Sequence, residues 1–373
     1  MAGPPIENGV VLIQNGKIKA VGPASSLPIP SGWQQRKAKV VTPGLIDAHA
    51  TAGLTGIFNQ DHDQDQLDHG SAIQAQLRAL DAFNLHEPLV AYLRSFGITC
   101  LHSSHAPGEL VSGQSLVVKT AGRTVDQAVL KAPAMLTATL RSSASKGARK
   151  SPGTRAKMVA MLRQEFIRAQ DYQRRRKESD QEGKAFQRDL NLEALAEALE
   201  GRLPVLITAD RAQDIASALR LQQEFGFSLV LDSAAESYLM PEEIHQAGVP
   251  VILHPTMARP QGDRENLSFR TAAKLKAAGI AVALQSGYES YVPKVRVVLF
   301  EAAVAAAHGL SFEQALATVT VDAARLLGVA DRVGSLEAGK DADLALYDGD
   351  PFEYTSHCIG VIIDGQVVES EPR

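Results

Sequence analysis

The chain has 373 residues, of which 45% are hydrophobic and 21% are charged, and its formal net charge is −4. The length suffices for one large domain with a smaller one beside it, and the composition is that of an ordinary globular protein. The acidic balance excludes a general attraction to nucleic acid, and no apolar run approaches the ~20 residues that span a bilayer. We therefore expect a small-molecule substrate or ligand, and neither a nucleic-acid nor a membrane partner.

The two cysteines and the first residues of the chain indicate in which cellular compartment the protein is expected. Cys100 and Cys358 form no C-x-x-C pair, so a disulfide framework is not indicated. The start at Met1 has neither the basic nor the apolar region of an export signal. We expect a cytoplasmic protein as the chain is given, while a longer natural N-terminus with an export signal stays an open alternative. A homo-oligomer is also left open.

Both ends of the chain are predicted to be rich in strands. Residues 6–22 alternate apolar and polar side chains around two Asn-Gly pairs, which is a strong hairpin signal. Residues 341–347 and 359–369 show the same alternation, the second around an Asp-Gly pair. We predict a composite β-sandwich domain built from residues 1–42 and 334–373.

The middle of the chain alternates short apolar runs with helical patterns, which is typical of a parallel sheet. Six barrel strands are predicted at 44–49, 97–102, 204–209, 228–232, 249–254 and 280–285, with 115–119 and 134–140 as candidates for the third and fourth. Helices are predicted at 154–177, 211–225, 268–278, 293–308 and 311–327. The predicted fold class is α/β, with a (β/α)₈ TIM-like barrel over residues 43–333.

One motif in the first predicted barrel strand carries chemical information. Residues 41–51 read VTPGLIDAHAT, and His49 and Thr51 lie on the same face of a strand because side chains repeat every second residue. A His-x-His pair at this place would direct two imidazoles at one metal ion. Here the second imidazole is replaced by a hydroxyl.

The motif resembles the first barrel strand of the amidohydrolase superfamily. Residues 6–22 resemble the opening hairpin of that superfamily and residues 334–347 its closing segment, and the stretch from Gly97 to Gln114 resembles the imidazolonepropionase-like branch. The resemblance implies the barrel-and-sandwich architecture. It also implies hydrolysis of carbon–nitrogen bonds other than peptide bonds by a metal-activated water.

The resemblance implies five positions for metal binding and proton transfer, and four of them are substituted. His49 is retained, whereas Thr51, Asp210, Ser233 and Gly287 stand at the other four. Hydroxyl groups are poor zinc ligands, and glycine has no side chain. We therefore expect zinc to be bound sub-stoichiometrically or not at all, and we expect no organic cofactor.

Other polar residues follow predicted strands and could rebuild the site. His254 ends the seventh strand, and with His49 and Asp210 it completes our tentative set of metal ligands. The catalytic residues stay unassigned, and the remaining pocket candidates follow in chain order: His102, His105, Ser233 and Glu289. We expect these side chains to meet because the strand ends of a barrel converge at one mouth.

Two functions remain after this reasoning. The first is a hydrolase that acts on a small amide or cyclic amide, by metal-activated water if a metal is retained. The alternative is a catalytically inactive amidohydrolase-like protein that binds a small ligand or a partner. Nucleophilic catalysis is disfavoured because the chain has no G-x-S-x-G turn, and because Ser103 and His105 are too close in sequence to indicate a dyad.

Overall fold

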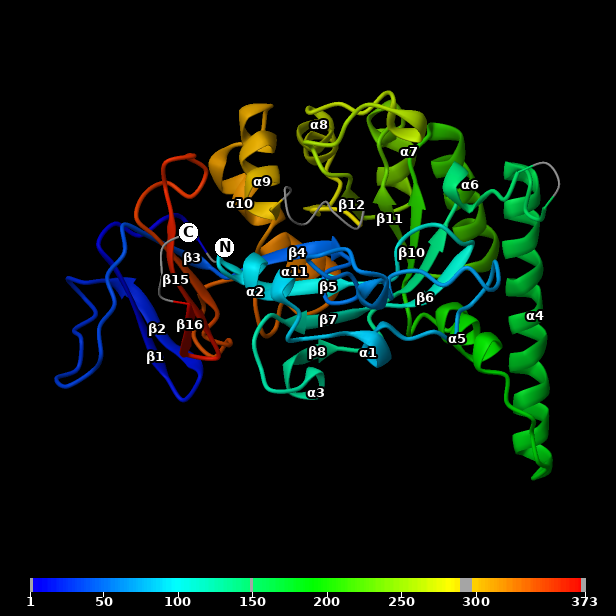
Figure 1. The fold of residues 1–373 in the computed structure, drawn as a ribbon, viewed down its shortest axis with the longest axis horizontal. Coiled ribbons are helices and arrows are strands. Elements are labelled where there is room, and N and C mark those ends of the chain that lie inside the picture. The colour runs from blue at the N-terminus through cyan, green and yellow to red at the C-terminus, as the bar shows by residue number, and fades with distance from the viewer. Residues whose placement is uncertain (1–2, 148–149, 289–296, 370–373) are drawn as a thin grey trace.

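The computed structural model describes residues 3–147, 150–288 and 297–369. Figure 1 shows a barrel surrounded by helices, with small sheets on one side and a long helix, α4 (Arg155–Glu182), on the opposite side. The pocket candidate Glu289 lies outside the described residues, as do the first residues of the helix predicted at 293–308.

A hairpin opens the chain. Strands β1 (Gly9–Gln14) and β2 (Lys17–Pro23) pair antiparallel. The turn between them has Asn15 at φ 53° and Gly16 at φ 76°. Both angles are positive, as the tight turns of right-twisted hairpins require, which explains the Asn-Gly signal in the sequence.

A second small sheet joins the two ends of the chain. Its four antiparallel strands are, in spatial order, β16 (Gln366–Glu369), β15 (Cys358–Ile363), β14 (Leu344–Tyr347) and β3 (Val40–Pro43). Ile18 of the hairpin belongs to the same buried apolar cluster as Leu344 and Ile362 of this sheet. The domain boundaries drawn from the sequence stay a prediction.

In the described part of the chain, seven parallel strands form most of the barrel, which confirms the predicted fold class. They are β4 (Leu45–Ala50), β5 (Ile98–Ser103), β9 (Leu136–Thr139), β10 (Val205–Ala209), β11 (Leu229–Ser233), β12 (Val251–Leu253) and β13 (Val282–Leu284). The barrel closes beyond β13, where Gly287 forms a parallel bridge with Ala50 and the Ser286 backbone N–H donates to Asp47 at 3.0 Å.

The remaining stave of the barrel runs antiparallel to its neighbours. It consists of β6 (Val111–Gln114), which pairs with β9, and β7 (Leu116–Lys119), which pairs with β5 and with the short β8 (Val129–Lys131). The chain between β5 and β6 contains no helix. Without a crossover helix the chain can only return antiparallel, and this stave therefore departs from the repeating pattern of a (β/α)₈ barrel.

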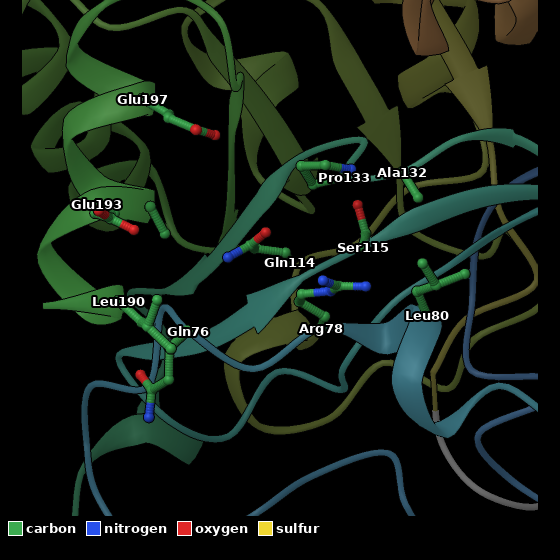
Figure 2. Close-up of a pocket in the computed structure, with 11 residues that line it drawn as sticks. Gln76, Arg78, Leu80, Gln114, Ser115, Ala132, Pro133, Leu190, Glu193 and Glu197 are labelled. Atoms are coloured by element: carbon green, nitrogen blue, oxygen red, sulfur yellow. The ribbon is translucent and has the colours of Figure 1, made fainter. Parts of the chain in front are cut away.

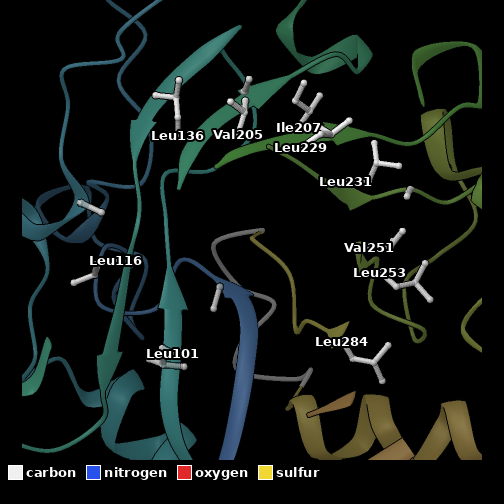
Figure 3. Packing of buried hydrophobic residues seen from close by; sticks show 14 of the residues in the cluster. Leu101, Leu116, Leu136, Val205, Ile207, Leu229, Leu231, Val251, Leu253 and Leu284 are labelled. Carbon is white, nitrogen blue, oxygen red and sulfur yellow. The ribbon is translucent and has the colours of Figure 1, made fainter. Parts of the chain in front are cut away.

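Side-chain alternation separates the inside of the barrel from its outside. Leu206, Val230, Ile252 and Ala283 share one buried cluster with three residues of α11, Ala323, Ala324 and Leu327, which close the floor of the barrel. The residues on either side of them in the strands, such as Val205, Leu229 and Leu253, belong to the outer cluster drawn in Figure 3. The next inward positions along the strands are polar, and they form the candidate site.

The helices predicted at 154–177, 211–225 and 268–278 are found at similar positions, whereas several other helices were not predicted. The helices that cover the barrel include α2 (Pro88–Arg94), α5 (Leu190–Leu199), α6 (Ala212–Phe225), α7 (Pro241–Gln246), α8 (Thr271–Ala277) and α9 (Val298–Ala307), with short helices α1 (Ala79–Ala82) and α3 (Val125–Ala128) beside them. The helix predicted at 311–327 is instead two helices, α10 (Phe312–Thr318) and α11 (Val321–Leu327). They are separated at Thr320, whose backbone is not helical and whose hydroxyl bonds the Leu316 carbonyl.

Candidate active site

Asp232 is the centre of a polar layer inside the barrel. Its Oδ2 accepts a hydrogen bond from the Thr208 hydroxyl at 2.7 Å, and its Oδ1 accepts from Gln285 Nε2 at 2.8 Å. The same Oδ1 lies 2.7 Å from Nδ1 of His49. Burial by itself raises the pKa of Asp232, but the attraction of His49 and these hydrogen bonds outweigh it and lower the pKa below its ordinary value. Asp232 is therefore a carboxylate at neutral pH.

His49 joins this carboxylate to a serine hydroxyl. With Nδ1 facing a carboxylate, Nδ1 carries the proton, and the lone pair of Nε2 points the other way. Ser104 Oγ lies 2.5 Å from Nε2. His49 is 1% exposed, and Ser104 and Asp232 are 0% exposed, so the chain of contacts is enclosed by protein.

His102, the neighbour of His49 on β5, is fixed by two hydrogen bonds. The two rings are 5.8 Å apart between centroids. Nδ1 of His102 donates to the Ala48 carbonyl at 2.6 Å, and Nε2 accepts from the Ser115 hydroxyl at 2.7 Å. Burial and the proximity of His49 lower the pKa of His102 to about 3, so the ring is neutral. Neither nitrogen has a lone pair left for a metal ion or a substrate.

His105 lies in the loop after β5 and has different surroundings. The residue is 5% exposed, and neither ring nitrogen has a hydrogen-bond partner among the described residues. Burial lowers its pKa to about 4. His105 thus stays a neutral imidazole beside β6, separate from the hydrogen-bonded chain that contains Ser104.

Asp210 and Ser233 contact each other at the barrel mouth. The Ser233 hydroxyl donates to Oδ1 of Asp210, and Arg141 Nε lies 3.4 Å from Oδ2. Burial raises the pKa of Asp210, and the positive charges of Arg141 and Arg264 act against that rise. Ser233 has a φ of 66°, in the left-handed region that only a few non-glycine residues adopt.

Tyr288 connects the two groups of residues. Its ring lies 5.3 Å from that of His49, and its hydroxyl accepts from Arg141 Nη1 at 2.6 Å. Burial raises its pKa above the ordinary tyrosine value, so it keeps its proton at neutral pH. His254 is fully buried, with Nδ1 2.8 Å from the carbonyl of Pro255.

Comparison with known proteins identifies the relatives of this chain. The amidohydrolase family matches residues 184–369. An imidazolonepropionase from Aeromonas hydrophila is 26% identical over 94% of this chain and 87% of its own length. The crystal structure of an amidohydrolase from Thermotoga maritima is 29% identical, with a TM-score of 0.91 over 97% of this chain and 95% of that one. The chain belongs to the amidohydrolase superfamily. Its place is the imidazolonepropionase-like branch of this family of carbon–nitrogen hydrolases.

One relative is much longer than this chain. The amidohydrolase tasK from Hapsidospora irregularis is 26% identical over 98% of this chain, which spans only 40% of the length of tasK. In the part of the chain that the structure describes, no helix is long and apolar enough to cross a membrane.

Amidohydrolases are generally metal-dependent, but the side chains at this barrel mouth do not fit a zinc ion. Nε2 of His49 accepts from Ser104, and Asp210 faces the guanidinium of Arg141, which would repel a cation. Thr51 offers only a hydroxyl, a poor zinc ligand. Across residues 3–147, 150–288 and 297–369, no group of three or more His, Cys, Asp or Glu side chains could hold a metal ion. The tentative ligand set of His49, Asp210 and His254 therefore does not form a zinc site in this arrangement.

Gly287, where the sequence resemblance leads us to expect an Asp, has a backbone conformation that favours glycine. Its φ is 102°, a conformation that residues with a Cβ rarely adopt. A carboxylate there would strain the backbone at the point where the barrel closes against Ala50.

A groove on the outside of the barrel is separate from this site. It has a volume of about 320 Å³ and is lined by Gln76, Arg78, Leu80, Gln114, Ser115, Ala132, Pro133, Leu190, Glu193, Ala194 and Glu197 (Figure 2). Ser115 is shared between the groove and the surroundings of His102. None of Ser104, His49 and Asp232 lines it.

Sequence reasoning missed Ser104, Asp232, Arg141 and Tyr288. A signal for Asp232 was present: it lies two residues after Val230, so strand alternation places both on the inward face. The sequence reasoning looked instead at Ser233, the next residue. No comparable signal exists for Ser104, because its partner His49 is 55 residues away in the chain.

Proposed function

We propose that the protein hydrolyses a carbon–nitrogen bond of a small amide or cyclic amide, with zinc bound sub-stoichiometrically or not at all. One observation carries this proposal: His49 has Nδ1 held by the Asp232 carboxylate and presents the lone pair of Nε2 to a hydroxyl. An imidazole fixed in this way can accept a proton and return it during a reaction. It lies at the ends of the barrel strands, where barrel enzymes carry out their chemistry.

The relatives support the substrate class. Several of them, including the Aeromonas hydrophila protein, are named imidazolonepropionase, which favours a cyclic amide as the substrate of this chain. The more general name of the Thermotoga maritima amidohydrolase keeps open-chain acyl-amino compounds in the proposed range. A cytoplasmic location and a small-molecule partner remain predictions.

A second candidate is an inactive member of the family that binds a small ligand. The observation that favours it is burial, because Ser104, His49 and Asp232 are all 1% exposed or less. In that case the three side chains would be a structural hydrogen-bond network. Substitution of His49 would then change the stability of the protein, and there would be no hydrolytic activity for it to affect.

The two candidates are separated by a substrate screen on protein of known metal content. Purified protein is analysed for zinc by mass spectrometry and incubated with lactams, imidazolones and N-acyl amino acids, and ring opening or amine release is followed. We expect turnover of at least one class with less than one equivalent of zinc. His49→Gln should lower that turnover by roughly 10²- to 10⁴-fold. A folded protein that turns over none of these compounds would favour the ligand-binding candidate.

A further inference from the structure

We propose that Ser104 is the nucleophile of this site and that hydrolysis proceeds through a covalent acyl-Ser104 intermediate, with His49 as general base and Asp232 as its positioning residue. The proposal rests on the hydrolase function proposed above and gives that function a mechanism. It assigns a serine to the role that metal-bound water would have in a metal-dependent relative.

The distances are those of a nucleophile, a base and an orienting carboxylate. Ser104 Oγ lies 2.5 Å from His49 Nε2, and His49 Nδ1 lies 2.7 Å from Asp232 Oδ1. A nucleophile and base within hydrogen-bond reach, with the base held by a third group, is the geometric signature of an activated hydroxyl. The signature depends on geometry and not on chain order, so the order His, Ser, Asp along this sequence is no obstacle.

Both ends of this arrangement are anchored. The backbone N–H of Ser104 donates to the Ala50 carbonyl at 3.0 Å, which ties Ser104 to the strand that carries His49. Asp232 cannot rotate away, because Thr208 and Gln285 also donate to its carboxylate. The Ser104 hydroxyl has a second acceptor, the His105 carbonyl at 3.1 Å, but His49 Nε2 is the closer one.

The ring orientation fixes the direction of proton transfer. Nδ1 of His49 faces Asp232 Oδ1 at 2.7 Å, so the ring turns Nε2 toward the Ser104 hydroxyl at 2.5 Å, and Nε2 is the nitrogen that can take the proton of Ser104. The lone pair of Nε2 would have to bind zinc in a metal-dependent arrangement. Serine and zinc therefore compete for one nitrogen, and Arg141 beside Asp210 makes the second ligand position unfavourable for a cation.

The reaction balances with water as the only co-substrate. Ser104 Oγ bonds to the amide carbonyl carbon and its proton passes to His49 Nε2. The carbon–nitrogen bond then breaks as His49 gives this proton to the leaving nitrogen. Water next attacks the acyl ester while His49 takes its proton, and the Ser104–carbon bond breaks as Ser104 recovers that proton. The products are a carboxylic acid and an amine, which stay joined in one molecule when the substrate is cyclic.

Burial sets a condition on the substrate. Ser104 is fully buried, so the reacting acyl group has to be small enough to enter the barrel mouth. A small sulfonylating reagent, methanesulfonyl fluoride, is therefore the appropriate probe. Ser103 provides a matched control, because it is the adjacent serine, is equally buried, and donates to the Ala52 carbonyl at 2.9 Å and not to a histidine.

The experiment combines labelling with turnover on the full chain. Wild type, Ser103→Ala, Ser104→Ala and His49→Gln are treated with methanesulfonyl fluoride, and adducts are located by peptide mass spectrometry. We expect the adduct on Ser104 in wild type and Ser103→Ala, none in Ser104→Ala, and labelling about 100-fold slower in His49→Gln. Mapping in wild type needs no variant, so a misfolded substitution would not remove the test.

The outcomes distinguish this inference from the proposed function. Two results would overturn the assignment of Ser104 as nucleophile and leave the proposed hydrolase function in place. One is wild-type protein that excess reagent does not label at Ser104, and the other is a Ser104→Ala variant that retains amide turnover. Specific Ser104 labelling that depends on His49, in a protein that turns over no amide or lactam, would support the nucleophile and overturn the proposed substrate class.

Discussion

Asp232 determines the tautomer of His49, so its substitution should impair the proton transfer that His49 performs at this site. Asp232→Asn keeps the shape of the side chain but removes the charge that holds Nδ1–H. The amide can turn its NH₂ toward His49 and so place the proton on the wrong nitrogen.

We expect Asp232→Asn to lower kcat by roughly 10²- to 10⁴-fold with KM nearly unchanged, as measured by steady-state kinetics on the best substrate of the screen. Thr208→Val is the matched control, because it removes one hydrogen bond to the same carboxylate and leaves its contact with His49 in place. An equal loss of kcat in both variants would show that Asp232 acts through packing and not through the imidazole.

Arg141 lies beside the buried carboxyl group of Asp210 at the barrel mouth. Asp210 is 0% exposed, and an isolated charge there would be costly. Arg141 lies 3.4 Å from Oδ2 of Asp210 and donates to Tyr288 at 2.6 Å. The guanidinium of Arg141 thus places a positive charge next to Asp210.

The site could be predicted only in part, for a physical reason. The sequence placed His49, Asp210 and His254 at strand ends because short strands are readable from apolar runs. The contact between His49 and Asp232 joins residues 183 positions apart, and it depends on the inward direction of each side chain. The position of a residue along its strand can be predicted from one sequence, whereas the residue that it contacts on another strand of the barrel cannot.

At the scale of elements, the antiparallel stave makes one of the contacts between the barrel and the terminal sheets. Lys119 on β7 is buried, and its Nζ lies 2.8 Å from Asp341, 3.0 Å from Asp343 and 2.6 Å from Asp364. Burial by itself lowers the pKa of Lys119, but Asp343 and the other partners raise it above the ordinary lysine value. Burial raises the pKa of Asp341, while Lys119 and Lys17 lower it to about 2.

We expect Lys119→Met to lower the free energy of unfolding by about 3 kcal/mol, because it leaves the buried carboxylate of Asp343 without its cation. Urea denaturation measures the change, and Lys119→Met with Asp343→Asn should recover part of it. Lys17→Met is the control: Lys17 also pairs with Asp341 but its side chain is 52% exposed, so the loss should stay below about 1 kcal/mol. Equal losses in the two single variants would contradict a special role for the buried lysine.

The elements themselves were largely predictable, and the exceptions have local causes. Strands such as β10 and β11 were found because each contains three consecutive apolar residues, 205–207 and 229–231, in a short segment between turns or loops. The antiparallel direction of the β6–β7 stave was missed, because an apolar run such as 115–119 does not indicate whether its strand will run parallel or antiparallel to its neighbours. The break between α10 and α11 was missed because helical periodicity continues through Thr320.

At the scale of the whole molecule, the barrel is closed by polar contacts and not only by packing. Asp47 accepts from the Ser286 backbone and hydroxyl next to the bridge between Ala50 and Gly287. The strand that carries His49 is thereby fixed to the last strand of the barrel, while Ser104 is fixed to it from the other side. The closed barrel thus holds a base, a hydroxyl and a carboxylate in place without a metal ion.

The most direct test of this account is turnover of the best amide or lactam substrate as a function of zinc bound per chain. Protein is freed of metal with a chelator, its zinc is quantified, and zinc is then added back in steps. We predict the same rate per chain before chelation, after chelation and after zinc is restored. The reason is that the lone pair on Nε2 of His49 accepts the hydrogen bond of Ser104 and does not bind zinc. A rate that disappears with the metal and returns in proportion to bound zinc would contradict the account.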